Sequence, residues 1–218
     1  MPRGPSSAHL LQREAILNES ADAFAQVGYP SATMAALAVR CGVSKSLLYH
    51  YYPAKDAILF DLMHEYMQRL QLLVMEVASQ NLPAQRALAE VVRRFVREYE
   101  TSRTRHIVLL NDVKFLPPVE REIVIRQERE VVQSFADLIV VTYRIDPARA
   151  KVLTMSVFGM INWTFTWLKP GGPLSYAQFA ETVVGMLESG LGGGAERMKN
   201  FKPVAASSND FKKEAHHV

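Results

Sequence analysis

The stretch that decides the fold runs from Thr33 to Tyr52 and reads TMAALAVRCGVSKSLLYHYY. Its spacing is typical of a helix-turn-helix, in which two short helices cross at a tight turn. Ala38 is small enough for the helices to approach closely, and Gly42 permits the left-handed backbone that side chains resist. Three further residues supply the apolar contacts between the helices: Leu37, Val43 and Leu48.

The second helix of this motif carries side chains that can hydrogen-bond to base edges or to phosphates. Its first helix, through Arg40, would cross the DNA backbone while the second enters the major groove. The pattern therefore predicts double-stranded DNA as a partner. The exposed residues of the second helix would be Ser44, Lys45, Ser46, Tyr49 and His50.

This region resembles the DNA-binding domain of TetR-family regulators. The match keeps the family's spacing over about a quarter of the chain, and it comprises Phe24-Ala25, Gly28-Tyr29, Thr33-Met34, Leu37-Ala38 and, apart from Ala54, the run from Cys41 to Asp56. The resemblance implies phosphate contacts for three residues: Thr33, Tyr51 and Lys55. It also implies that Tyr52 packs inward and that the groove is faced by Lys45, Ser46, Tyr49 and His50. The family often has glycine or alanine where Ser46 stands, which leaves the base contact of Ser46 open.

Some of these residues also have a purely structural interpretation. Tyr49 fits the aromatic core of a small bundle as well as it fits a base contact, and His50 in isolation would be a surface histidine. Cys41 is more typical of a small apolar filler in the turn than of a redox sensor, because no second cysteine or basic cluster adjoins it.

Helical periodicity dominates the rest of the chain and strand patterns are scarce, which predicts an all-α fold. Beyond the motif we expect helices over residues 8–27, from Lys55 to about 81, from Pro83 past Tyr99, and over 103–115, 117–143, 146–168 and 175–190. The predicted architecture is an N-terminal three-helix helix-turn-helix domain over residues 8–55, a C-terminal helical ligand-binding and dimerisation domain over 56–191, and a flexible polar tail over 192–218.

Composition permits a nucleic-acid partner without demanding one, since the net charge is +3 and the isoelectric point about 9.0. A single cysteine excludes an intrachain disulfide and suits a reducing cytoplasm, where we expect the protein to act. The stretch Val152–Leu168 carries no charge, but it is short for a membrane span and contains several hydroxyl groups. We expect it to be buried against its own core and a partner subunit, with no membrane involved.

The final helix also indicates pairing of subunits. One of its sides is apolar, and other positions are small enough for close helix approach. The apolar side comprises Phe179, Val183, Met186, Leu187 and Gly190, and the small residues are Ala180, Gly185 and Ser189. A monomer would leave this side in water, so the pattern predicts a two-fold homodimer.

The segment Gly159–Gly172 is similar to one in a TetR subgroup that senses acyl-coenzyme A thioesters. Trp163 and Trp167, four residues apart, would share a helix face and line an apolar cavity with Phe115, or they would be core or dimer aromatics. Asn111 and Asp112 would be polar anchors in that cavity, or a solvated edge. A basic cluster that could receive a coenzyme A phosphate, or be ordinary surface, comprises Arg103, Arg105 and His106.

The sequence contains no pattern typical of a catalytic or metal-binding site, so we predict neither an enzyme nor a cofactor or metal site. The sequence has no glycine-rich phosphate loop, nucleophile elbow or paired helical histidines. The predicted function is a ligand-responsive transcriptional repressor that binds a palindromic operator as a dimer and is released by a small hydrophobic effector, with an acyl-coenzyme A thioester as the candidate. The alternatives are a multidrug-sensing TetR-type repressor and a helical interaction protein that does not bind DNA.

Overall fold

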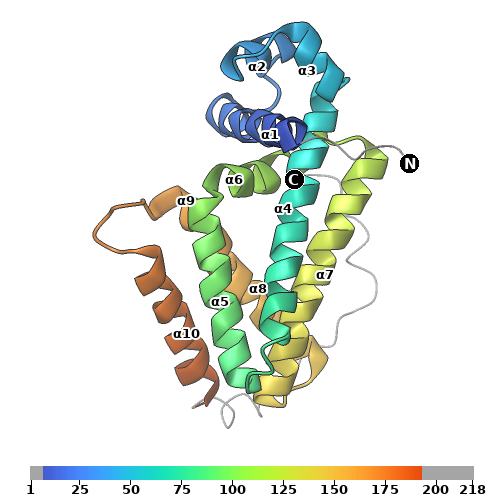
Figure 1. The fold of residues 1–218 in the computed structure, drawn as a ribbon. Coiled ribbons are helices and arrows are strands. Elements are labelled where there is room, and N and C mark those ends of the chain that lie inside the picture. Colours follow the sequence, from blue (N-terminus) through green and yellow to red (C-terminus); the bar gives the residue numbers. More distant parts are fainter. Residues whose placement is uncertain (1–6, 193–218) are drawn as a thin grey trace, which may run out of the picture. The chain divides into compact units, whose positions relative to one another are not determined.

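The computed structural model describes residues 7–192, which are helical without any strand, so the predicted all-α fold is confirmed (Figure 1). Its helices are α1 (Ser7–Val27), α2 (Met34–Arg40), α3 (Lys45–Tyr51), α4 (Lys55–Ala78), α5 (Ala84–Thr101), α6 (Arg103–Asp112), the 3-10 turn η1 (Val113–Phe115), α7 (Pro118–Tyr143), α8 (Pro147–Asn162), α9 (Thr164–Trp167) and α10 (Tyr176–Gly192). The first compact unit of the chain ends at Val184, within α10, and the contacts below belong to this unit. Apart from Gly192, the predicted tail lies outside the described residues.

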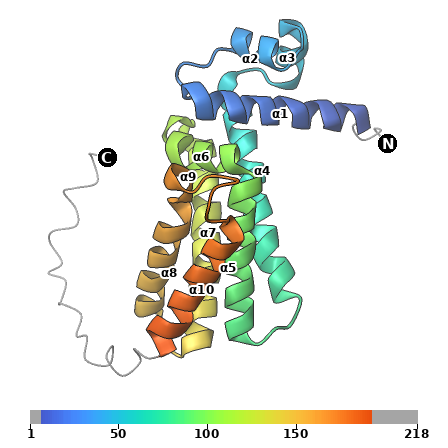
Figure 2. The same cartoon turned by 90° about the vertical axis from the view of Figure 1, so that its left-hand side faces the viewer.

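The three N-terminal helices gather at one end of α4, and α6 lies against α1 (Figures 1 and 2). The apolar side chains of Ile16, Leu17 and Phe24 on α1 are buried, whereas Leu10 and Leu11 near its start are exposed. This helix ends at Gly28, whose φ of +79° continues the chain in the left-handed region that favours glycine. Contacts between α1 and α4 therefore hold the three N-terminal helices at the start of α4.

Helix α4 is the common support of both halves, because its N-terminal turns meet α1 and its remaining turns pack on α5 and α7. The apolar stripe that the sequence predicts on it is buried throughout: Ile58, Leu59, Leu62, Met63, Tyr66, Leu70, Leu73 and Val77. Around it α5, α7 and α8 complete a bundle whose centre is aromatic. The ring of Phe135 lies 5.6 Å from that of Phe95 and 5.0 Å from that of Phe158 between centroids.

The helix predicted over residues 146–168, which contains the uncharged stretch from Val152 to Leu168, is not continuous. Helix α8 ends at Asn162, and Trp163 separates it from the short α9. The hydroxyl of Thr164 donates to the carbonyl of Ile161, and that of Thr166 donates to the carbonyl of Trp163, both at 2.7 Å. Side-chain bonds of this kind compete with the helical ladder and favour a break. Within the described residues no helix is long and apolar enough to span a membrane.

Candidate nucleic-acid interface and ligand cavity

The turn between α2 and α3 is built as the sequence predicts. Gly42 has a φ of +65°, and the amide of Val43 donates to the carbonyl of Ala38 at 3.0 Å. The hydroxyl of Thr33 caps α2 by accepting from the amide of Ala36 at 3.2 Å, and that of Ser44 caps α3 by accepting from the amide of Leu47 at 3.1 Å. Each helix therefore starts at a fixed residue, and the turn fixes their crossing.

Helix α3 is anchored by one side chain, since Leu48 is its only fully buried residue. The five predicted groove-facing residues are all exposed: Ser44, Lys45, Ser46, Tyr49 and His50. Tyr49 is 51% exposed and so does not belong to the core of the domain. The hydroxyls of Ser44 and Ser46 lie 3.0 Å apart. The outer face of α3 is thus a continuous surface of hydrogen-bonding groups.

The three residues predicted to contact phosphates have different surroundings. Thr33 is exposed at the start of α2, with its hydroxyl engaged in the cap. Tyr51, at the end of α3, is half-buried and stacks on His9 of α1 at 4.6 Å between ring centroids. Its neighbour Tyr52 is buried, as the resemblance implies.

Lys55 is engaged with the loop that joins α1 to α2. Its ammonium donates to the carbonyls of Tyr29 and Ala32, both at 2.7 Å, and lies 4.1 Å from the centre of the Tyr29 ring. Burial lowers the pKa of Lys55, and the nearby carboxylate of Asp112 opposes that effect. Lys55 therefore fixes the loop in front of α2, a role that the sequence did not indicate.

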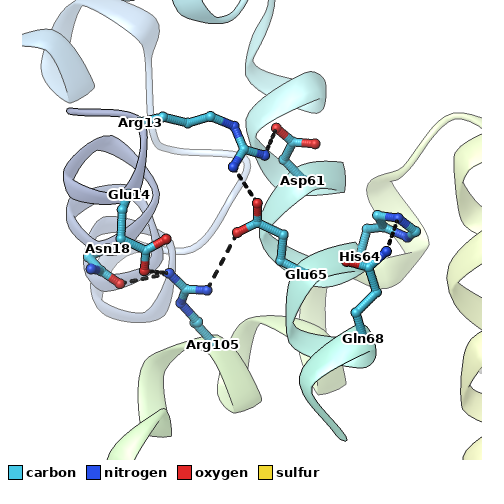
Figure 3. Close-up of polar contacts among 8 residues, drawn as sticks. All are labelled: Arg13, Glu14, Asn18, Asp61, His64, Glu65, Gln68 and Arg105. Carbon is cyan, nitrogen blue, oxygen red and sulfur yellow. Dashed lines mark hydrogen bonds and ion pairs between the residues drawn. The ribbon is translucent and has the colours of Figure 1, made fainter. Parts of the chain in front are cut away.

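Arginines from α1 and α6 connect the small domain to α4 (Figure 3). Arg13 forms ion pairs with Asp61, at 2.7 Å, and with Glu65. Arg105 reaches Glu14 of α1 at 2.5 Å and Glu65 of α4 at 3.9 Å. Figure 3 shows Glu65 between the two guanidinium groups. Arg105 is thus occupied by contacts between helices rather than presented as part of a surface cluster.

The residues predicted from α6 and η1 as effector contacts lie at the same junction. Phe115 stacks on Tyr29 at 5.4 Å between ring centroids, and the buried Asp112 acts electrostatically on Lys55. Burial raises the pKa of Asp112, whereas two lysines, Lys55 included, lower it. Asn111 is exposed. This part of the predicted effector site contacts the loop before α2.

A cavity of about 210 Å³ lies among α4, α5, α6, α7 and α8. Its lining is mostly apolar: Met67, Leu70, Leu109, Leu110, Val131, Val132, Met155 and Phe158. Four residues bring polar groups to it: Tyr99, His106, Glu128 and Asn162. An apolar hollow with few convergent polar groups is the usual form of a small-molecule site. Two larger hollows, of about 480 Å³ and 660 Å³, lie along α4 and α7; the first has Gln68, Gln71 and Glu130 on its walls, and the second is mostly apolar.

His106 forms one wall of this cavity and is 2% exposed. Burial lowers its pKa to about 4, partly offset by its contact with the backbone of Asn162. The ring is therefore neutral at pH 7, and its neighbours define the tautomer. Nε2 donates to the carbonyl of Asn162 at 3.4 Å, and Nδ1 accepts from the hydroxyl of Tyr66 at 3.3 Å. The ring also stacks on Tyr99 at 3.8 Å between centroids.

None of the five predicted effector residues lines the cavity. Trp163 is 63% and Trp167 48% exposed in the single chain. Trp163 contacts Phe165, and Trp167 contacts Phe179. The structure therefore does not bring the tryptophans together with Phe115. The residues that do line the cavity come from helices that are far apart in the sequence. The sequence indicated only, through the helical periodicity of each helix, that one of its faces would be buried.

The comparisons with known proteins agree with this geometry. Residues 16–62 match the family of bacterial regulatory proteins of the tetR family, and residues 81–191 match the tetracyclin repressor-like C-terminal domain. A TetR-family transcriptional regulator from Bordetella parapertussis 12822 is 32% identical, with a TM-score of 0.77 over 80% of this chain and 93% of that one. The chain belongs to the TetR family of transcriptional regulators, which are DNA-binding proteins with a ligand-binding domain rather than enzymes.

Two further solved structures resemble the chain. AibR, in complex with isovaleryl coenzyme A and operator DNA, is 25% identical, with a TM-score of 0.70 over 80% of this chain and 97% of that one. The ketosteroid regulator KstR2 of Mycobacterium tuberculosis is 15% identical, with a TM-score of 0.75 over 83% of this chain and 94% of that one. The latter likeness shows a shared fold alone.

Proposed function

We propose that this regulator is a repressor that binds a near-palindromic operator as a homodimer and leaves it when a small effector binds in its C-terminal half. The observation that carries the DNA-binding part is the outer face of α3, fully exposed and hydrogen-bonding, on a turn fixed by Gly42. One such helix reads too few base pairs to find a single genomic site, so two copies must act together.

The proposed domains are the DNA-binding domain over residues 8–55 and the effector and dimerisation domain over 56–191. In the first, Lys45, Ser46, Tyr49 and His50, together with Ser44, would face the major groove. Thr33, Tyr51 and Lys55 would contact phosphates at its edges. Footprinting with purified protein tests this: we expect two related half-sites about one helical turn or more apart. Protection of a single asymmetric half-site by a monomer would refute it.

Helix α8 supports the dimer more directly than the last helix does. Phe179 and Val183 are already buried within one chain, so they do not leave an apolar stripe in water. By contrast, α8 exposes 65% of Val152 and 53% of Met155, and Trp163 directly follows it. Apolar side chains grouped in this way are typical of a surface that a partner covers. We propose that a second copy packs against this side of α8.

We propose an acyl-coenzyme A thioester as the effector. At about 30 Å³ per water molecule, the cavity of about 210 Å³ holds about seven waters, which is enough room for a short branched acyl group. AibR, whose structure contains isovaleryl coenzyme A, is similar over most of its length. The rest of the thioester would lie outside the cavity, where Arg103 and the exposed Trp163 and Trp167 are candidates to contact it. Arg103 donates to the carbonyl of Phe165 at 2.6 Å and forms no ion pair among the described residues.

Asn111, Asp112 and Phe115 would not bind the acyl group in this proposal. They would instead transmit the binding of the effector to the loop before α2.

Release from the operator tests the effector class. The protein–operator complex is titrated with acyl-coenzyme A thioesters, free coenzyme A, free acids and hydrophobic cationic drugs. A hundredfold loss of operator affinity requires about 2.7 kcal/mol of coupling, and the same factor must weaken effector binding when DNA is present. Release by thioesters alone supports the proposal. Release by cationic drugs alone would favour a multidrug sensor instead.

A further inference from the structure

The polar groups of the cavity differ in whether the protein already satisfies them. Both ring nitrogens of His106 have partners. Glu128, which is half-buried, has no hydrogen bond or ion pair within residues 7–192. Its neighbour Arg129 pairs instead with Glu122 at 3.1 Å. A ligand that fills the hollow displaces the water around this carboxylate, which then requires a hydrogen-bonding partner from the ligand.

Two further groups share this requirement. The side-chain oxygen of Asn162 is shielded from solvent and accepts no hydrogen bond in the described part of the chain. The hydroxyl of Tyr99 shows no partner there either, and Tyr99 is near enough to Glu128 that the carboxylate adds to the effect of burial in raising the pKa of this phenol. The cavity therefore offers a carboxylate and an amide oxygen that need donors, beside a phenol that can donate.

A hydroxyl meets the needs of the carboxylate and the phenol together, because it donates one hydrogen bond and accepts others. It could donate to Glu128 and accept from Tyr99 at once. An unsubstituted chain would leave the carboxylate unpaired, and a free carboxylate would place a like charge beside it. Burial raises the pKa of Glu128, and the charge of the adjacent Arg129 opposes that effect.

We infer that the part of the effector that enters this cavity carries a hydroxyl, and that Glu128, with Tyr99, selects it over an unsubstituted chain and against a free acid. This inference rests on the proposal that the cavity is the effector site. It assigns a specificity determinant, Glu128, on a helix where the sequence analysis predicted no site. It also explains how a regulator could distinguish a thioester from the acid that it yields on hydrolysis.

The test uses the full-length protein and two sets of matched compounds. The first set is isovaleryl-coenzyme A and 3-hydroxyisovaleryl-coenzyme A, measured by operator release and by calorimetric binding. The second set lacks coenzyme A: 3-methylbutan-1-ol, 3-methylbutylamine and isovalerate, measured by ligand-observed NMR. We expect the hydroxylated thioester to bind at least tenfold more tightly than the plain one, since a hydrogen bond to a charged group has that effect. In the second set the alcohol should bind best and isovalerate worst.

Three variants show whether Glu128 causes the preference. Glu128→Leu should abolish the tenfold difference, and Glu128→Gln should weaken it while allowing isovalerate to bind. Glu130→Gln is the matched control, because Glu130 lies on the same helix outside the cavity and should leave both preferences unchanged. Thermal melting of each variant checks the fold, and the glutamine variant serves if the leucine variant does not fold.

The outcomes separate this inference from the proposed function. Equal binding of the two thioesters, or a preference that survives in Glu128→Leu, overturns the inference and leaves the thioester proposal standing. A Glu128-dependent preference for the alcohol, without any thioester binding, overturns the thioester proposal and supports the inference. Tighter binding of the amine than of the alcohol would make the site one for a cation and overturn the hydroxyl assignment. If no compound binds, both ideas are wrong.

Discussion

The DNA-binding motif and the proposed effector cavity are built by opposite means. The motif is made by consecutive residues from Thr33 to Tyr52, and the side chains that we propose to face the major groove are exposed to solvent. The cavity is made by residues from five helices, between Met67 and Asn162, and its polar groups are buried or half-buried. A hydrogen bond on the first surface competes with water, whereas a polar group in the second has no such alternative. Substitutions should therefore act differently in the two regions.

The largest expected effect concerns the buried wall of the cavity and acts on stability. His106 has a pKa of about 4 when folded, against about 6.5 when unfolded. Because the unfolded chain takes up the proton first, the free energy of unfolding should fall as the pH drops from 6.5 to 4. A difference of one pKa unit between the two states corresponds to about 1.4 kcal/mol. The free energy of unfolding should therefore fall by about 3 kcal/mol in total because of His106.

Urea unfolding at several pH values, at constant protein concentration, measures this loss. His106→Gln should remove it and flatten the profile between pH 6.5 and 4. Glu128 and Asp112, whose pKa values are raised by burial, act in the opposite sense and are present in both proteins. The difference between wild type and variant therefore isolates the histidine. Identical profiles would mean that His106 binds a proton as readily in the folded protein as in the unfolded chain.

The next effect concerns the turn. Gly42→Val should cost about 1–3 kcal/mol, because a β-branched residue at a φ of +65° strains the backbone. An added Cβ would meet no atom within 4 Å, so the strain is conformational rather than steric. We expect operator binding to be lost while the protein stays dimeric. Gly42→Asn is the control, since asparagine tolerates the left-handed region, and it should retain most of the affinity. Equal behaviour of the two variants would contradict this account.

The same contrast, between consecutive residues and distant helices, explains how much of each region can be predicted from the sequence. Gly42, Ala38 and Leu48 stand at fixed spacings within one motif, so local rules are enough to place them. The apolar stripe of α4 is predictable for the same reason, because periodicity identifies a buried face. These features belong to a single element or to two adjacent ones.

The cavity could not be predicted in this way, because its walls depend on how distant helices meet. Trp163 and Trp167 look like a shared helical face only while the helix is taken as continuous; Trp163 lies at the break and contacts Phe165, whereas Trp167 ends α9 and contacts Phe179. His106 reads as part of a basic cluster in sequence, yet the packing of α6 turns it inward. The sequence around Lys55 likewise does not indicate that its ammonium will donate to the carbonyls of Tyr29 and Ala32, in a loop more than 20 residues earlier in the chain.

A smaller effect distinguishes base contacts from phosphate contacts on α3. Tyr49→Ala and Lys45→Ala should change which bases are preferred, at about 1–2 kcal/mol for each lost contact, because both side chains stand on the exposed face. Binding to randomised operator libraries measures the preference directly. If Tyr49→Ala weakens specific and random DNA alike, Tyr49 contacts phosphate or supports the helix.

The smallest effect, and the one that connects the two regions, concerns Lys55. Its ammonium is charged and lies at the start of α4, beside the loop that leads into α2. If it also contacts a phosphate, Lys55→Ala should weaken binding to all sequences about equally. It should also reduce the slope of log affinity against log salt by about one unit, the value for a single phosphate. The loop contacts predict a different signature, because the loss of hydrogen bonds to Tyr29 and Ala32 would lower stability and affinity without changing the salt slope. Measuring affinity at four or more salt concentrations, together with thermal melting, separates the two contributions. An unchanged slope in a destabilised variant would show that Lys55 acts on DNA only by holding the loop in place.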